Sequence, residues 1–75
     1  MSRVLLLDAD QPHDVFELVE LHEGLARVRT AFLYEIGEEL KVRIEDGGAT
    51  SDTIARVRAH VGTGPDKITE LELVG

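Results

Sequence analysis

The chain has 75 residues, no cysteine, and 15 acidic against 8 basic residues, which gives a formal net charge of −7. A chain this short forms one domain, because it buries only about 60% of the surface that it exposes when unfolded. The lack of cysteine excludes disulfides and thiolate metal sites. An acidic chain repels phosphate groups, so we expect neither nucleic acid nor a membrane as its partner.

No apolar run reaches the length of a transmembrane helix, and Val4 to Leu7 is too short for a signal-peptide core. We therefore predict a cytoplasmic protein. The three histidines lack zinc-ligand spacing, and no Gly-rich phosphate loop or nucleophile with its base is found in the sequence. We predict no metal, no cofactor and no catalytic residue, hence no enzyme.

The N-terminal third contains two expected strands. Arg3 to Asp8 is a short apolar run that predicts a buried strand, and Ala9 to Asp14 predicts a turn because Pro12 cannot donate to a ladder. Val15 to His22 follows as a second strand. A helix over the same residues is the alternative, but the Pro-containing turn before it favours the strand.

The middle of the chain has the clearest alternation. Leu25 to Thr30 and Glu39 to Glu45 place apolar side chains on one face and charged ones on the other, as half-buried strands do. Between them a bend carries Phe32, Leu33, Tyr34 and Ile36 and stops at Gly37. The bend either plugs one end of the core or leaves an adhesive apolar patch. Asp46-Gly47-Gly48 supplies the residues that a tight reversal needs.

The C-terminal third predicts a hairpin. Ser51 to Val61 fits a strand with Val61 on the buried face, although a helix capped by Ser51 is the alternative. Lys67 to Val74 is the last strand after a Gly-Pro-Asp turn. If Val61 pairs with Lys67, Arg58 lies opposite Glu70 and Arg56 opposite Glu72, and each exposed pair contributes only about 0 to 1 kcal/mol.

These six strands, about ten residues apart, predict an all-β domain that is either a small antiparallel β-barrel or a very small sandwich. A closed six-stranded barrel is favoured, because a chain of 75 residues cannot leave many edge hydrogen bonds open. The run ELVELHEGLARVRTAFLYEIGEELKVRIE, together with the later ARVRAHVG and KITELEL, resembles the PilZ domain family over nearly the whole chain. The resemblance implies a six-stranded barrel in bacterial signalling. In that family, cyclic di-GMP is bound by an RxxxR motif and a [D/N]xSxxG motif.

Both motifs are altered in this chain. Glu20 occupies the position of Asp or Asn, and His22 occupies the position of Ser. Leu25 occupies the position of the final Gly, and Gly24 lies one residue before it. Arg3 alone represents the first motif. Each charged phosphate contact contributes on the order of 1.5 to 3 kcal/mol. We therefore expect that cyclic di-GMP is not bound in the usual way.

Two groups of candidate residues follow from the pattern and the resemblance. A ligand, if bound, would meet Arg3, Glu20, His22, Gly24, Arg27 and Arg29. A protein partner would meet a stripe of outward cations on strands expected to be neighbours, or the bend. The stripe comprises Arg27, Arg29, Lys41, Arg43, Arg56 and Arg58. The partner-binding candidates are Arg43, Arg56, Arg58, Phe32 and Tyr34. A solvated face balanced by glutamates is the alternative for the cations.

The main hypothesis is a non-catalytic PilZ-like regulatory or protein-interaction module. The alternative is a cyclic di-GMP receptor with a relocated Arg-rich site formed by Arg3, His22 and the Arg27/Arg29 pair. An oligonucleotide-binding barrel would need more surface aromatics than three in the whole chain. A homodimer formed by edge pairing or through the bend is a further hypothesis.

Overall fold

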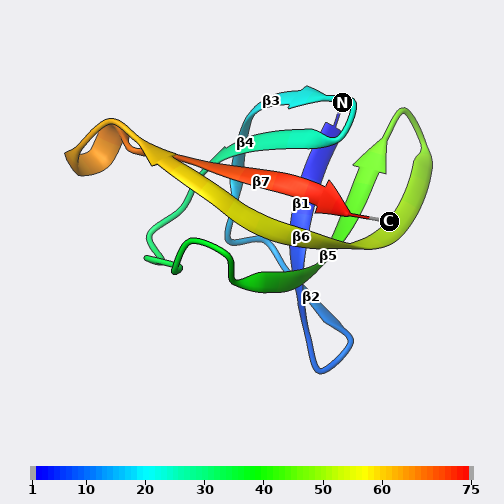
Figure 1. The fold of residues 1–75 in the computed structure, drawn as a ribbon. Coiled ribbons are helices and arrows are strands. Elements are labelled where there is room, and N and C mark those ends of the chain that lie inside the picture. Colours follow the sequence, from blue (N-terminus) through cyan, green and yellow to red (C-terminus); the bar gives the residue numbers. More distant parts are fainter. Residues whose placement is uncertain (1, 75) are drawn as a thin grey trace.

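The computed structural model describes residues 2–74, except for the side chain of residue 65, and contains one antiparallel sheet of seven strands (Figure 1). The strands lie in the order β2-β1-β5-β6-β7-β4-β3. Their bounds, with the one helical turn η1, are β1 Ser2–Asp8, β2 Gln11–His13, β3 Glu17–His22, β4 Leu25–Arg29, β5 Glu39–Asp46, β6 Ala49–Val61, η1 Gly64–Asp66 and β7 Ile68–Val74.

The all-β prediction is confirmed, but closure of the sheet into a barrel is not detected. The sheet curls so that β1 and β3 come into contact, yet no ladder joins these two strands in residues 2–74. One reason for the missing ladder is that β2 pairs with β1 from Leu6 to Asp8. β3 would have to pair with this same edge of β1 to close the barrel. The molecule is therefore a curled, open sheet with one strand more than expected.

The additional strand replaces most of the turn predicted over Ala9 to Asp14. Only Ala9 and Asp10 form the reversal, with φ values of 51° and 64°. Pro12 then pairs with Leu7 in β2, at the border of the sheet. An edge strand tolerates proline, since its missing N–H interrupts no inner ladder. The sequence prediction was wrong here because it treated proline as excluding any strand.

The other strand predictions are confirmed within a residue or two. Val15 to His22 becomes β3 from Glu17, and Ser51 to Val61 lies within β6, so neither helical alternative occurs. The reversal after β5 has Gly47 and Gly48 at φ values of 59° and 88°. Two positive φ angles are what a two-residue turn of type I′ requires.

A bulge in β6 changes the predicted register of the C-terminal hairpin. The pairing with β7 shifts by one residue between Val57 and Ala59, which leaves Arg58 as the extra residue. Arg56 lies opposite Glu72 as predicted, but Ala59, and not Arg58, lies opposite Glu70. The shift also turns Val61 outward, so that it is exposed instead of buried.

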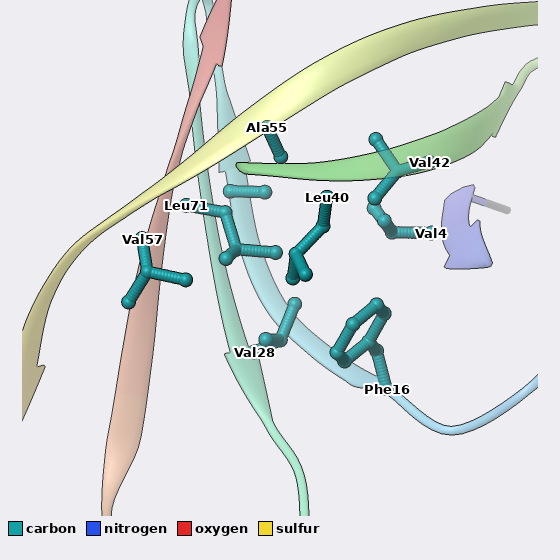
Figure 2. Close-up of a cluster of buried hydrophobic side chains, with 9 residues drawn as sticks. Val4, Phe16, Val28, Leu40, Val42, Ala55, Val57 and Leu71 are labelled. Carbon is teal, nitrogen blue, oxygen red and sulfur yellow. The ribbon is translucent and has the colours of Figure 1, made fainter. Parts of the chain in front are cut away.

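The core fills the space inside the curled sheet. Figure 2 shows side chains from β1, β4, β5, β6 and β7, with Phe16 before β3, converging on one centre. The fully or nearly fully buried members are Val4, Phe16, Ala26, Val28, Leu40, Val42, Ala55, Val57 and Leu71. Each buried Val, Leu or Phe side chain contributes about 1.5 to 3 kcal/mol by leaving water. This core fixes the positions of the surface strands and of the bend.

Both edges of the sheet are short or irregular. β2 has three residues and contains Pro12. β3 has a register shift between Leu18 and Glu20, which leaves Val19 as a bulge residue with 45% exposure. Neither edge offers a long regular ladder to a second chain. This arrangement disfavours the hypothesis of a homodimer formed by edge pairing.

Candidate functional site

The outward cations do not form one stripe. β5 and β6 are neighbours, as expected, but β7 lies between β6 and β4. Arg27 and Arg29 on β4 are thus separated from Lys41, Arg43 and Arg56 by a strand whose outward residues Glu70 and Glu72 are acidic. Strand order depends on long-range pairing, which the alternation of residues does not encode.

Most of these cations are paired with carboxylates. Six of the eight basic residues form ion pairs, and Arg58 has no carboxylate partner within ion-pair distance in residues 2–74. The pairs are Arg3–Glu45, Arg27–Glu70 (2.9 Å), Arg27–Glu20 (3.1 Å), Arg29–Glu17 (3.4 Å), Lys41–Asp10 (3.5 Å), Arg43–Asp52 (2.8 Å) and Arg56–Glu39 (3.2 Å). The geometry matches the solvated, balanced face that was the alternative to a binding stripe.

The Arg43–Asp52 pair has the most regular geometry. Nε of Arg43 donates to Oδ1 at 2.8 Å and Nη2 donates to Oδ2 at 3.2 Å, so the contact is bidentate. These hydrogen bonds, followed by the charge of Arg43, lower the pKa of Asp52 below 3.8. A ligand that needed Arg43 would have to displace a two-point contact.

Five of the six predicted ligand residues lie on the β3–β4 hairpin, and four of them gather near its turn. Glu20 contacts both His22 and Arg27, and Arg27 also donates to Glu70 on β7. These hydrogen bonds, to Glu70 first and then to Glu20, raise the pKa of Arg27. Gly24 forms the turn at a φ of 79°. The hairpin residues therefore satisfy one another.

Arg3 and Arg29 lie away from this group, Arg3 on another strand and Arg29 at the open end of the hairpin. Arg3 is on β1 and is paired with Glu45 of β5. Arg29 lines an open depression of about 780 Å³ at the opposite end of the hairpin from Gly24. The guanidinium Nε of Arg29 is buried and has no hydrogen-bond partner in the described structure. Lys67, Asp14 and Glu17 line the same depression. No motif or spacing in the sequence indicates that these separate segments meet there.

The bend between β4 and β5, residues 30–38, is firmly attached to the sheet. The Gly37 amide donates to the Val57 carbonyl at 2.7 Å, and the Val57 amide donates to the Glu38 carbonyl at 2.8 Å. Within the bend, the Glu38 amide donates to the Glu35 carbonyl at 3.1 Å. The main-chain bonds to β6 continue the β5–β6 ladder for one more step.

His60 fastens the bend at a second point. Its Nε2 lies 2.7 Å from the carbonyl oxygen of Tyr34, and its Nδ1 lies 3.0 Å from Oγ1 of the fully buried Thr69. A carbonyl only accepts, so Nε2 donates its proton, and in the neutral ring Nδ1 accepts the Thr69 hydroxyl proton. The alternation in Ser51 to Val61, with Val61 on the buried face, predicted that His60 points outward, so this contact was not expected.

The bend presents apolar side chains to solvent. Phe32 is 50% exposed, Leu33 76% and Ile36 60%, and we call these three residues the bend patch. Tyr34 turns inward instead and packs between the rings of Phe16 and Phe32, at centroid distances of 6.2 and 6.0 Å. Burial, and then the charge of Glu38, raise the pKa of Tyr34. The bend is thus anchored by one aromatic residue while it exposes three other apolar side chains.

The comparisons with known proteins add no relative: no family model, no curated protein and no solved structure matches the chain. In residues 2–74, no cluster of three or more His, Asp or Glu side chains could hold a metal ion. The described part of the chain also contains no helix with the length and hydropathy needed to cross a membrane.

Proposed function

We propose that this chain is a non-catalytic interaction module that contacts a protein partner through the bend patch. The observation that carries the proposal is the combination of exposure and rigidity in residues 30–38. Leu33 and Ile36 are more than half exposed on a segment whose backbone is hydrogen-bonded to β6 and to His60. Exposed apolar side chains that are held in place mark binding surfaces, and ordering costs at such surfaces are small.

The non-catalytic part of the proposal rests on how the candidate general bases are engaged. Both ring nitrogens of His60 are engaged by Tyr34 and Thr69, and His22 contacts Glu20. A catalytic base needs a nitrogen directed at a substrate or at a nucleophile. The proposed PilZ-like regulatory setting in bacterial signalling rests on the sequence resemblance.

Usual cyclic di-GMP binding is disfavoured by the ion pairs of the arginines it would need. Arg3 is held by Glu45, and Arg27 is held by Glu20 and Glu70. A ligand phosphate would have to replace these carboxylates and leave their charges unpaired. This cost supports a protein partner over the nucleotide.

Site-specific photo-crosslinking in the producing cells tests the proposal. A photoreactive amino acid at Leu33 should give one discrete crosslinked product, because this side chain, 76% exposed, is the most exposed of the bend patch. The product should disappear when Phe32→Ser is added. The same label at exposed Asp8, at the far end of β1, is the matched control. Absence of a product at Leu33, or equal products at both positions, would refute the proposal.

The depression at Arg29 favours a second candidate function, the receptor with a relocated Arg-rich site. Arg29 and Lys67 both line it, and Nε of Arg29 has no acceptor in the described residues. Calorimetric titration with cyclic di-GMP tests this candidate. Saturable micromolar binding that Arg27→Gln with Arg29→Gln abolishes, and that Arg43→Gln leaves intact, would establish it over the interaction module. No heat of binding would remove it.

A further inference from the structure

The bend carries negative charge beside its apolar side chains. Glu35, Glu38 and Glu39 lie among the residues of the bend patch or directly after them, and residues 30–39 contain no Lys, Arg or His. All three glutamates are exposed. Glu39 is partly neutralised by Arg56 at 3.2 Å, whereas Glu35 and Glu38 have no ion-pair partner in residues 2–74. The neighbouring strands β5 and β6 carry cations as well as carboxylates, whereas all the charged residues of the bend are acidic.

We infer that the partner of the bend patch is a cationic amphipathic segment, with large apolar side chains flanked by Lys or Arg. This inference rests on the proposed function and adds the chemistry of the partner. The apolar side chains would cover Phe32, Leu33 and Ile36, and the cations would meet Glu35 and Glu38. Complementary charge of this kind sets partner choice and the rate of association more than affinity.

Two other occupants fit the charge less well. A second copy of this chain would bring another net charge of −7 and the same glutamates to the contact. An anionic lipid surface would also be repelled by Glu35 and Glu38. The net charge of the whole chain attracts a cationic segment from a distance in addition to the local contacts.

The structure also indicates how strong the contact is. The bend is held in place before binding by the Gly37–Val57, Glu38–Val57 and Tyr34–His60 hydrogen bonds, so little ordering is required of it. Its apolar area is limited to three side chains, which is characteristic of small and transient interfaces. We expect dissociation constants in the micromolar range that rise with salt concentration.

A designed peptide serves as the probe. It has about 14 residues of Leu and Lys, arranged so that an α-helix carries Leu on one face. A matched peptide has Glu in place of Lys. Tyr34 is the only tyrosine and the chain has no tryptophan, so the intrinsic fluorescence of the protein reports on the bend. Amide shifts of residues 30–39 give an independent location for binding.

The Leu-Lys peptide should bind at the bend and the Leu-Glu peptide should not. Phe32→Ser with Leu33→Ser should weaken binding about tenfold or more, since exposed anchors of this kind dominate small interfaces. Glu35→Gln with Glu38→Gln should weaken binding about threefold and reduce its salt dependence. Val19→Ser with Val61→Ser, and Asp8→Asn with Asp14→Asn, change exposed apolar and acidic residues elsewhere and should leave binding unchanged.

The inference is wrong if the Leu-Glu peptide binds as well, if the control variants lose as much affinity as the bend variants, or if the amide shifts lie outside residues 30–39. It is also wrong if the bend amides shift with protein concentration alone or with anionic vesicles, which would indicate self-association or a lipid surface. A Leu33 crosslink in cells that the Leu-Lys peptide does not displace would leave the proposed function standing and refute only the cationic partner.

Discussion

The strand surfaces and the bend are both exposed to water, but they differ in whether their side chains have contact partners within the molecule. On the strands, charged side chains such as Arg43 and Arg27 meet carboxylates of the same sheet. On the bend, the backbone is bonded to β6 and His60 while Phe32, Leu33 and Ile36 face solvent. Neither exposure nor charge alone marks a candidate surface. A region stands out when its backbone is fixed and its side chains still lack partners.

Leu71→Ala should have the largest effect because it removes support from both regions at once. Leu71 is fully buried on β7 and belongs to the core cluster shown in Figure 2. The cavity and the lost burial should lower the free energy of unfolding by about 2 to 5 kcal/mol. Urea denaturation followed by circular dichroism measures this loss. A loss below about 1 kcal/mol would show that the core is less tightly packed than described.

His60→Ala should affect the bend more than the strands. It removes the hydrogen bond to the Tyr34 carbonyl and leaves the buried Thr69 hydroxyl without its partner. We expect a loss of about 1 to 3 kcal/mol in the free energy of unfolding. Hydrogen exchange should accelerate at Gly37 and Glu38 more than at Val42 in β5. Arg58→Ala is the control on the same strand, and equal effects of the two variants would contradict a specific role of His60.

Gly37→Ala tests the backbone attachment of the bend without touching its surface side chains. Gly37 has a φ of 91°, and a Cβ added there would meet nothing within 4 Å. The cost is therefore conformational, about 1 to 2 kcal/mol, since L residues with a Cβ avoid positive φ. Thermal unfolding measures it. An unchanged melting temperature would mean that the bend can adopt another conformation at no cost.

Asp52→Asn should have the smallest effect, and it tests the ion pairing of the strand surfaces. Arg43 lowers the pKa of Asp52 in the folded state, so the carboxylate stabilises the fold at neutral pH. That contribution is lost as the pH falls below 3.8 and through the lowered pKa of the folded state. The variant should therefore show a shallower decrease of stability with acid than the wild type does. Asp8→Asn is the control, and an identical slope for both variants would contradict the pairing.

Much of the fold followed from local patterns in the sequence. The alternation in Leu25 to Thr30 and Glu39 to Glu45 predicted β4 and β5, and Gly47 with Gly48 predicted the reversal after them. These features depend on the side-chain period of a strand and on φ preferences, which neighbouring residues determine. Alternation therefore predicted which residues form strands but left their order in the sheet open.

The features that were missed depend on contacts between distant segments. Because of the bulge at Arg58, Glu70 lies opposite Ala59 and not opposite Arg58 as predicted. The ion-pair partner of Glu70 is instead Arg27 on β4. Strand order brings Arg29 and Lys67 to the same depression and brings His60 within hydrogen-bond distance of the Tyr34 carbonyl. No spacing in the sequence predicts these contacts between distant segments. Likewise, the sequence does not show which bend residue packs beside Phe16. That residue is Tyr34, and Leu33 and Ile36 are exposed.

The short and irregular edges of the sheet have a consequence for the behaviour of the protein at high concentration. Growth of a cross-β fibril needs a straight strand with a continuous row of free amides and carbonyls. Pro12 interrupts that row in β2, and the bulge at Val19 bends β3. A folded chain with these borders should stay dispersed even when it is crowded, although its middle third is rich in alternating strand sequence.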